Sequence, residues 1–229
     1  MSTKTKKVRV DILLVERDIC PSRERAQALI MSGKVFAGEN RIDKAGTLVF
    51  PDADLRIEGA DNPYVSRGGL KLKGALQAFG INVRDMIILD VGASTGGFTD
   101  CLLQEGAKKI YAVDVGYGQL AWKLRTDERV VVIERTNIRY FDGSGIEDPI
   151  DMATIDASFI SLKLVIPAVL RLIKKNDAVI LALIKPQFEA GREEIEKHGV
   201  IRNPETHTRV VEKIKDFCME LGLSVIEVC

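Results

Sequence analysis

The sequence predicts an α/β protein in two parts, a small α+β domain over residues 1–61 and a larger body over residues 62–229 that holds a mostly parallel sheet. The length of 229 residues exceeds the roughly 150 residues typical of one domain. From Met86 onward, short apolar runs alternate with helical runs, as in a parallel sheet covered on both faces. An acidic stretch, Asp52–Asp61, followed by Asn62 and Pro63, is typical of a linker.

Composition and charge exclude several classes of protein. With 46% hydrophobic and 29% charged residues, the chain is neither disordered nor of low complexity. Basic and acidic residues number 33 each, but residues 1–50 hold ten basic against six acidic residues, so a net charge of +4 is followed by −4 over residues 51–229. No signal peptide is expected, and the longest apolar run, residues 178–184, is far below the ~20 residues that span a bilayer. We therefore expect a cytoplasmic protein.

The first elements are two short helices and a few short strands. Residues 8–19 place Val10, Leu13 and Leu14 at helical spacing. Ser22 is an N-cap candidate for a helix over residues 23–31, which Gly33 ends. Strand-like pieces follow at residues 34–36, 47–50 and 55–57, separated by turns at residues 37–40 and 51–54.

Basic side chains surround this helix pair and suit contact with a phosphate backbone, although a solvated charged face would look similar. The candidates are Arg9, Arg23, Arg25 and Lys34. The strings RVDxxL, SRxxAxxxI and GxV resemble the alpha-L RNA-binding domain, on the positions Arg9, Asp11, Leu14, Ser22, Arg23, Ala26, Ile30, Gly33 and Val35. Phe36-Ala37-Gly38 departs from that pattern.

The body alternates strands and helices in order. Strands are expected at residues 86–91, 109–115, 130–134, 151–156, 178–185 and 223–228, and helices at residues 71–79, 98–106, 119–125 and 162–173 and in a last segment that begins at Asn203-Pro204. This is the order of a Rossmann-like body, whose ligands bind beyond the carboxyl ends of the strands. Four charged residues end strands there, namely Asp90, Asp114, Asp156 and Lys185, although an Asp after a strand is often only a turn residue.

The segment Asp90–Asp100, DVGASTGGFTD, is predicted to hold a cofactor. Gly92, Gly96 and Gly97 allow a sharp turn and close approach of a ligand, with Ser94 among them, and the next helix begins with free N–H groups. The G-xxx-GG spacing disfavours NAD without excluding it, and there is no Walker lysine. S-adenosylmethionine fits, because an acid after the second strand can bind both ribose hydroxyls, and Asp114 has that position. The alternatives are a glycine turn that serves only packing and, for Asn137, a turn residue instead of an adenine contact.

Further motifs indicate the family. SRGGLKL, DVGASTGGFTD, DASFISL and LIKPQFE occur in this order, and with the alpha-L string the chain resembles the FtsJ-like 2′-O-ribose methyltransferases, in particular the TlyA-type ribosomal RNA methyltransferases that are sometimes labelled hemolysins. The resemblance implies ribosomal RNA or ribosomal subunits as the partner and S-adenosylmethionine as the cofactor. It also implies a Lys-Asp-Lys-Glu set around the reacting hydroxyl, matched here by Lys71, Asp156 and Lys185. No residue matches the Glu, and we expect it in an added segment beyond Cys229.

The chemistry requires alignment of the hydroxyl with the methyl group and removal of one proton. Lys185 either accepts that proton or stabilises the developing alkoxide as a cation, and the sequence leaves both open. We expect an orienting role for Asp156 and a supporting role for Lys71. His198 and His207 are expected at the surface and Cys101 and Cys218 as small buried side chains, with no metal site.

Two rival functions remain. The unmatched Glu favours a non-catalytic RNA-binding protein on a methyltransferase scaffold, which labelled methyl transfer would test. A membrane-active hemolysin is disfavoured, since no strongly amphipathic basic helix is present.

Overall fold

The computed structural model describes residues 6–58, 62–191, 194 and 200–229, so His198 and part of the expected linker lie outside the described residues. The chain divides into two compact units, Met1–Asp61 and Asn62–Cys229. None of the helices in these ranges is long and apolar enough to cross a membrane.

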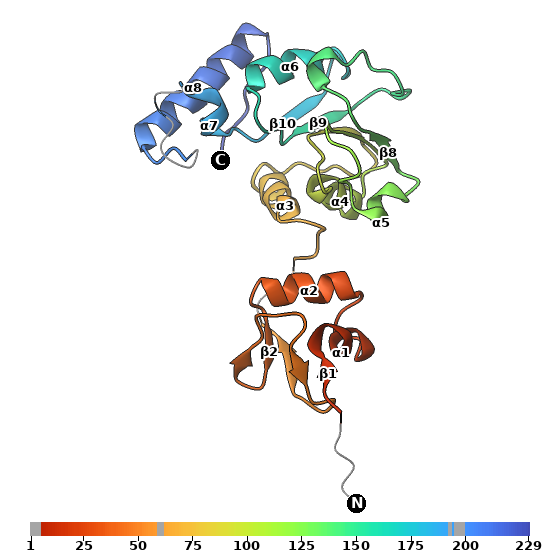
Figure 1. The fold of residues 1–229 in the computed structure, drawn as a ribbon. Helices are drawn as coiled ribbons and strands as arrows, with labels where there is room; N and C mark the ends of the chain where they lie inside the picture. Colours follow the sequence, from red (N-terminus) through yellow and green to blue (C-terminus); the bar gives the residue numbers. More distant parts are fainter. Residues whose placement is uncertain (1–5, 59–61, 192–193, 195–199) are drawn as a thin grey trace, which may run out of the picture. The chain divides into compact units, whose positions relative to one another are not determined.

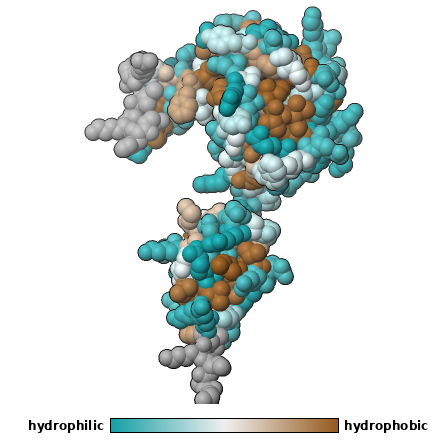
Figure 2. Space-filling view, turned by 45° about the vertical axis from the view of Figure 1, so that its right-hand side comes forward, coloured by the Kyte–Doolittle hydropathy of each residue, from teal (hydrophilic) through white to brown (hydrophobic). Residues whose placement is uncertain are grey.

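The described residues of the smaller unit form two helices and two small sheets. Figure 1 shows their arrangement, and Figure 2 shows hydrophilic and hydrophobic residues side by side on the visible face of the unit. The helices are α1, Val10–Glu16, and α2, Arg23–Met31. Strand β1, Val8–Arg9, pairs with β4, Leu48–Val49, and a second antiparallel sheet has the order β3-β2-β5, with β2 at Val35–Ala37, β3 at Asn40–Arg41 and β5 at Leu55–Ile57. The apolar positions expected of both helices, among them Val10, Leu14, Ala26 and Ile30, are buried in one core.

In this unit the predicted helix caps are confirmed, whereas the predicted turns are confirmed only in part: Ala53 N donates to Phe50 O at the expected turn over residues 51–54. The Ser22 side chain accepts from Arg25 N as the N-cap of α2, and Gly33 has a φ of +70° after the helix end, as expected. The expected turn over residues 37–40 is wrong at both ends, because Ala37 pairs with Asn40 and only Gly38 and Glu39 form the turn. Gly38 has a φ of +57°, which permits so tight a connection.

The larger unit is built on a five-stranded, wholly parallel sheet in the order β10-β9-β6-β7-β8. The strands are β6 (Ile87–Val91), β7 (Lys109–Val113), β8 (Val130–Ile133), β9 (Met152–Ile155) and β10 (Val179–Ala182). The chain starts in the middle, adds β7 and β8 on one side, and then returns to add β9 and β10 on the other. The expected Rossmann-like body is confirmed, and the switch in direction lies between β6 and β9, where such sheets bind ligands.

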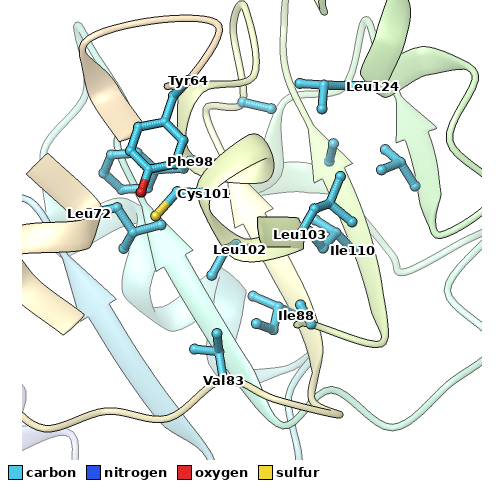
Figure 3. Packing of buried hydrophobic residues seen from close by; sticks show 14 of the residues in the cluster. Tyr64, Leu72, Val83, Ile88, Phe98, Cys101, Leu102, Leu103, Ile110 and Leu124 are labelled. Carbon is cyan, nitrogen blue, oxygen red and sulfur yellow. The ribbon is translucent and has the colours of Figure 1, made fainter. Parts of the chain in front are cut away.

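Helices cover both faces of this sheet (Figure 1). Three of them, α3 (Gly68–Ala78), α4 (Gly97–Gln104) and α5 (Trp122–Arg125), pack on one face, and Figure 3 shows their side chains around α4 with Ile88 and Ile110 of the strands. On the other face lie α6 (Leu162–Leu170), the 3₁₀ turn η1 (Ile138–Tyr140) and part of α8 (Pro204–Glu220). A short helix α7, Pro186–Glu189, follows β10.

Two expected elements of this unit are wrong in extent. The helix expected over residues 119–125 begins only at Trp122, because Ala121 is extended and its N–H donates to Thr95 O. Residues 223–228 form no strand: Leu223 N closes the end of α8 on Cys218 O, and no described strand pairs with the segment. A strand-like sequence needs a ladder partner, and Ile226 is 88% exposed. By contrast, Asn203 caps α8 as expected, through its side chain to Glu205 N.

Candidate active site

The turn between β6 and α4 brings the glycine loop to the end of β9. Gly92 has a φ of +84°, and a Cβ there would lie 2.8 Å from the carbonyl oxygen of Asp156. Contacts that short are essentially absent from proteins, so this position requires glycine for close approach as well as for its φ. Gly92 therefore fixes the loop beside the residue that we expect to be catalytic.

Gly96 and Gly97 are required by packing. Gly96 is the N-cap of α4 at a φ of +95°, and a Cβ there would lie 2.2 Å from Leu124 Cδ1. A Cβ at Gly97 would lie 2.1 Å from Ser66 Oγ and 3.0 Å from Gly69 N. The packing explanation raised from the sequence thus accounts for these two glycines, and a role in cofactor binding for them remains a proposal.

The SRGG segment forms the start of α3 and packs on the start of α4. A Cβ at Gly69 would lie 2.3 Å from Tyr64 Cγ, so the second glycine leaves space for that ring. Figure 3 shows Tyr64 together with Phe98, Leu72 and Cys101, and burial raises the pKa of Tyr64 to about 12. Lys71, in the first turn of α3, is exposed and forms no hydrogen bond or ion pair with a described residue.

Asp90 lies beneath the glycine loop and not on it. Its carboxyl group is fully buried, with Oδ2 accepting from Thr99 Oγ1 at 2.6 Å and Oδ1 from Thr154 Oγ1 at 2.9 Å. Burial raises the pKa of Asp90 to about 6, although both hydrogen bonds lower it. The carboxyl group thus joins β6 to β9 and α4 and has no exposed surface. This favours a supporting position for Asp90, and the expected cofactor contact stays a prediction.

Asp114, directly after β7, faces the glycine loop. Its Oδ2 accepts from Ser94 N at 2.8 Å, and its Oδ1 accepts from Gly116 N at 2.7 Å. Each carboxylate oxygen can accept a second hydrogen bond. The side chain is partly exposed, and the neighbouring Val115 is 70% exposed. Asp114 thus holds the glycine loop in place, and its carboxylate oxygens can still accept hydrogen bonds from hydroxyl groups of a ligand.

Asn137 lies after β8 and caps η1. Its Oδ1 accepts from Arg139 N at 3.1 Å, and the residue is exposed. This contact matches the turn role that the sequence left open, while its amide nitrogen has no partner among the described residues. An adenine contact through that nitrogen remains a proposal.

Asp156 and Lys185 meet at the carboxyl edge of the sheet. Asp156 directly follows β9. Lys185 follows β10 after two further residues and caps α7, which begins at Pro186. Lys185 Nζ lies 2.6 Å from Asp156 Oδ1, 2.8 Å from Ser158 Oγ and 3.3 Å from the Asp156 carbonyl oxygen. The side chains are 17% and 22% exposed for Lys185 and Asp156. The sequence predicted both residues, while Ser158 was missed.

A buried glutamate connects the motif that contains Asp156, DASFISL, to the motif that contains Lys185, LIKPQFE. Glu189, the last residue of LIKPQFE, accepts from Ser161 Oγ and from Leu162 N, both at 2.6 Å. These donors belong to DASFISL, at the start of α6, where a carboxylate also interacts favourably with the helix dipole. Sequence reasoning missed this role, for which the acid at the end of LIKPQFE was the available signal.

The expected RNA-contacting side chains of the smaller unit are organised by Asp11. The Asp11 carboxylate is buried and accepts from Arg9 Nε and Nη2 at 3.0 Å, from Arg23 Nε at 2.9 Å and from Gln27 Nε2 at 2.9 Å. The Arg9 hydrogen bonds hold the pKa of Asp11 well below its usual range. Both arginines remain about half exposed, so they are fixed in place and still have free N–H groups.

The remaining predicted residues fall at three places. Arg25 and Lys34 are partly buried in the smaller unit. His207 is exposed on α8, with Nε2 2.8 Å from the Ile201 carbonyl oxygen. Cys101 is buried and Cys218 is partly buried, and burial raises the pKa of both thiols.

Comparison with known proteins places this site in a family. A family model described as FtsJ-like methyltransferase matches residues 64–229. The chain is 53% identical over 219 residues to "Putative rRNA methyltransferase YqxC" of Bacillus subtilis (strain 168), covering 95% of this chain and 78% of that protein. It is 44% identical over 218 residues to "16S/23S rRNA (cytidine-2'-O)-methyltransferase TlyA" of Mycobacterium tuberculosis (strain ATCC 25618 / H37Rv), covering 95% and 81%. A solved structure, "Putative hemolysin from Streptococcus thermophilus", is 45% identical with a TM-score of 0.74 and covers 97% of this chain and 82% of its own. Both units are therefore shared with these proteins.

Proposed function

This chain belongs to the FtsJ-like methyltransferase family, and we propose that it transfers a methyl group from S-adenosylmethionine to a ribose 2′-hydroxyl of ribosomal RNA. The observation that carries the proposal is the close pair of Lys185 and Asp156 beside the glycine loop. The name of the Mycobacterium tuberculosis relative specifies a cytidine, and the 44% identity supports the same nucleotide here.

The described residues fit S-adenosylmethionine. Asp114 offers carboxylate oxygens at the end of β7, the exposed Val115 offers an apolar surface next to it, and the glycine loop lies against Asp114 through Ser94 N. When bound, this cofactor supplies a methyl group on a positively charged sulfur. We assign Asp114 to its ribose hydroxyls, Ser94 and Gly92 to the loop that encloses it, and Asn137 to its adenine.

Lys185 is best suited to stabilise negative charge. Nζ donates hydrogen bonds to Ser158 Oγ and to the Asp156 carbonyl oxygen and lies at ion-pair distance from Asp156 Oδ1. An ammonium group has three N–H donors, so one of them is left for an oxygen of the substrate. A cation fixed there stabilises the charge that develops on the ribose oxygen as its proton leaves. Asp156 Oδ1 is buried behind Nζ and accepts no hydrogen bond of good geometry from a described residue, while the side chain keeps 22% of its surface. We assign the exposed part of the Asp156 carboxyl to orienting the hydroxyl.

Lys71 lies on the exposed first turn of α3, which packs beside the glycine loop through Gly69 and Gly97. The Lys71 amine, exposed at that place, is suited to donate hydrogen bonds to phosphate or hydroxyl groups of the substrate. We assign further RNA contacts to the smaller unit, where Asp11 holds Arg9 and Arg23, Arg25 lies on α2, and Lys34 lies between α2 and β2. We propose that this unit, Met1–Asp61, is an alpha-L RNA-binding domain.

Methyl transfer with three forms of Lys185 tests this proposal. Lys185→Ala should abolish transfer of labelled methyl groups to ribosomal subunits while S-adenosylmethionine still binds. Lys185→Arg keeps a cation that cannot act as a base, so it should retain measurable transfer if charge stabilisation is the role. Full turnover by Lys185→Ala would contradict the proposal, and inactivity of Lys185→Arg would favour proton removal by the lysine. Failure of the unchanged protein to methylate any RNA would favour the non-catalytic alternative.

A further inference from the structure

The larger unit carries a basic and aromatic strip outside its predicted site. It consists of Tyr117, Arg135, Arg139, Tyr140 and Arg171, which we call the arginine–tyrosine strip. We propose that this strip binds a single-stranded segment of the RNA that flanks the methylated nucleotide, an inference that rests on the proposed function for its choice of ligand.

The residues of the strip follow the ends of β7, of β8, which is the edge strand of the sheet, and of α6. Arg135 N donates to Gly116 O at 2.9 Å, which joins the segment after β8 to the loop that holds Tyr117. Arg139 is the fourth residue after Arg135, so their Cα atoms lie within about 14 Å. Arg171, after α6, donates to the Arg139 carbonyl oxygen at 3.2 Å. The strip thus begins beside Asp114 at the carboxyl edge and runs toward the end of α6.

Two of its arginines lie over exposed aromatic rings. The Arg135 guanidinium is 4.2 Å from the centroid of the Tyr117 ring, and that of Arg139 is 5.1 Å from the centroid of the Tyr140 ring. The tyrosines are 68% and 72% exposed. A guanidinium on a ring uses its flat face and leaves its N–H edges free for phosphate oxygens. Exposed rings of this kind are the surface on which unpaired bases stack.

The charge of the strip is not neutralised by the protein. Arg135, Arg139 and Arg171 have no carboxylate at ion-pair distance among the described residues, whereas the adjacent Glu134 is paired with Arg125. Residues 51–229 carry a net charge of −4, so three uncompensated arginines in one strip stand out from their surroundings. Arg135 also has a φ of +53°, a conformation that costs energy for a side-chain-bearing residue and persists only where the surroundings impose it.

The chemistry of the strip favours single-stranded RNA over an acidic protein partner. Arginines alone would suit either ligand, but alternating arginines and open aromatic faces suit a chain that presents both phosphates and bases. The location agrees with this choice, because the strip begins after β7 and β8 at the same carboxyl edge of the sheet as Asp156 and Lys185, which follow β9 and β10.

Binding of purified ribosomal RNA over a range of salt concentrations tests the charge. The double variant Arg135→Ala/Arg139→Ala should lower the slope of log K against log salt by about 1.4, since each contact with a single strand contributes about 0.7. The matched control is Arg129→Ala, an arginine at the other end of β8 that is already paired with Asp127 at 2.7 Å. We expect the slope of the control to equal that of the unchanged protein.

Ring variants test the stacking. Tyr117→Ala or Tyr140→Ala should weaken binding roughly 5- to 150-fold each, whereas Tyr117→Phe keeps the face and should bind normally. The proposal would be overturned if Arg135→Ala/Arg139→Ala left the salt dependence of RNA binding unchanged and both Tyr→Ala variants left the RNA affinity unchanged. A loss of S-adenosylmethionine binding with unchanged RNA binding would also overturn it, by assigning Tyr117 and Arg135 to the cofactor site. Because binding is measured without turnover, failure of the strip and failure of the methyl-transfer proposal remain distinguishable.

Discussion

Asp90 makes the stability of the larger unit depend on pH in an unusual direction. Its carboxyl group is fully buried, and burial raises the pKa to about 6 from a reference value of 3.8. Between these two values the folded protein binds a proton that the unfolded chain does not. The stabilising effect of this proton is present below pH 4 and is lost as the pH rises through 6.

The size of the effect follows from the shift in pKa. Two pKa units at about 1.4 kcal/mol each give roughly 3 kcal/mol of unfolding free energy, lost between about pH 4 and pH 7. Asp90→Asn keeps the shape and cannot ionise, and the Thr99 and Thr154 hydroxyls can bond to its amide. The difference in stability between the variant and the unchanged protein should therefore shift by about 3 kcal/mol in favour of the variant over this range.

Urea unfolding followed by circular dichroism at several pH values between 4 and 7.5 measures this difference. Thr154→Val removes a hydrogen bond that lowers the pKa of Asp90, so its loss of stability should extend to higher pH. S-adenosylmethionine binding should change little in Asp90→Asn, because the group has no exposed surface. If the free energies of unfolding of Asp90→Asn and of the unchanged protein differ by the same amount at every pH, the reasoning is refuted.

Three further predictions concern the cofactor site, the helix packing and the smaller unit. Asp114→Ala should weaken S-adenosylmethionine binding about 10- to 150-fold in calorimetry through lost charge-assisted hydrogen bonds, whereas the exposed Asp142→Ala should not. Gly69→Ala should lower stability by about 1–3 kcal/mol through overlap with Tyr64, while Gly74→Ala in the same helix, with nothing within 4 Å, should be neutral or stabilising in thermal unfolding. Asp11→Asn should reduce RNA affinity without affecting cofactor binding; unchanged RNA affinity would mean that the ordered positions of Arg9 and Arg23 do not matter.

The sequence predicts best where a pattern is repeated or capped. The order of strands and helices in the body follows from apolar periodicity, and Ser22 and Asn203 are found as caps because short polar side chains in front of apolar helices have one common use. Asp156 and Lys185 were found because parallel strands bring their carboxyl ends to one edge.

The features that could not be predicted from the sequence depend on contacts between segments that are distant along the chain. Asp90 and Asp114 both follow the same kind of apolar run, yet Asp90 is enclosed by Thr99 and Thr154 while Asp114 faces the loop. The burial of Asp11 between two arginines and the docking of Glu189 on Ser161 require the fold to be known. Residues 223–228 have strand-like composition, but composition does not reveal whether a ladder partner exists.

The position of the transferred methyl group tests the central claim most directly. Ribosomal subunits are incubated with the protein and labelled S-adenosylmethionine, and the RNA is then digested with alkali, which cannot cleave next to a 2′-O-methylated ribose. We expect the label in alkali-resistant dinucleotides, and we expect it to be absent with Lys185→Ala. Label in alkali-sensitive mononucleotides would place the methyl group on a base, and would contradict the assignment of Lys185 and Asp156 to a ribose hydroxyl.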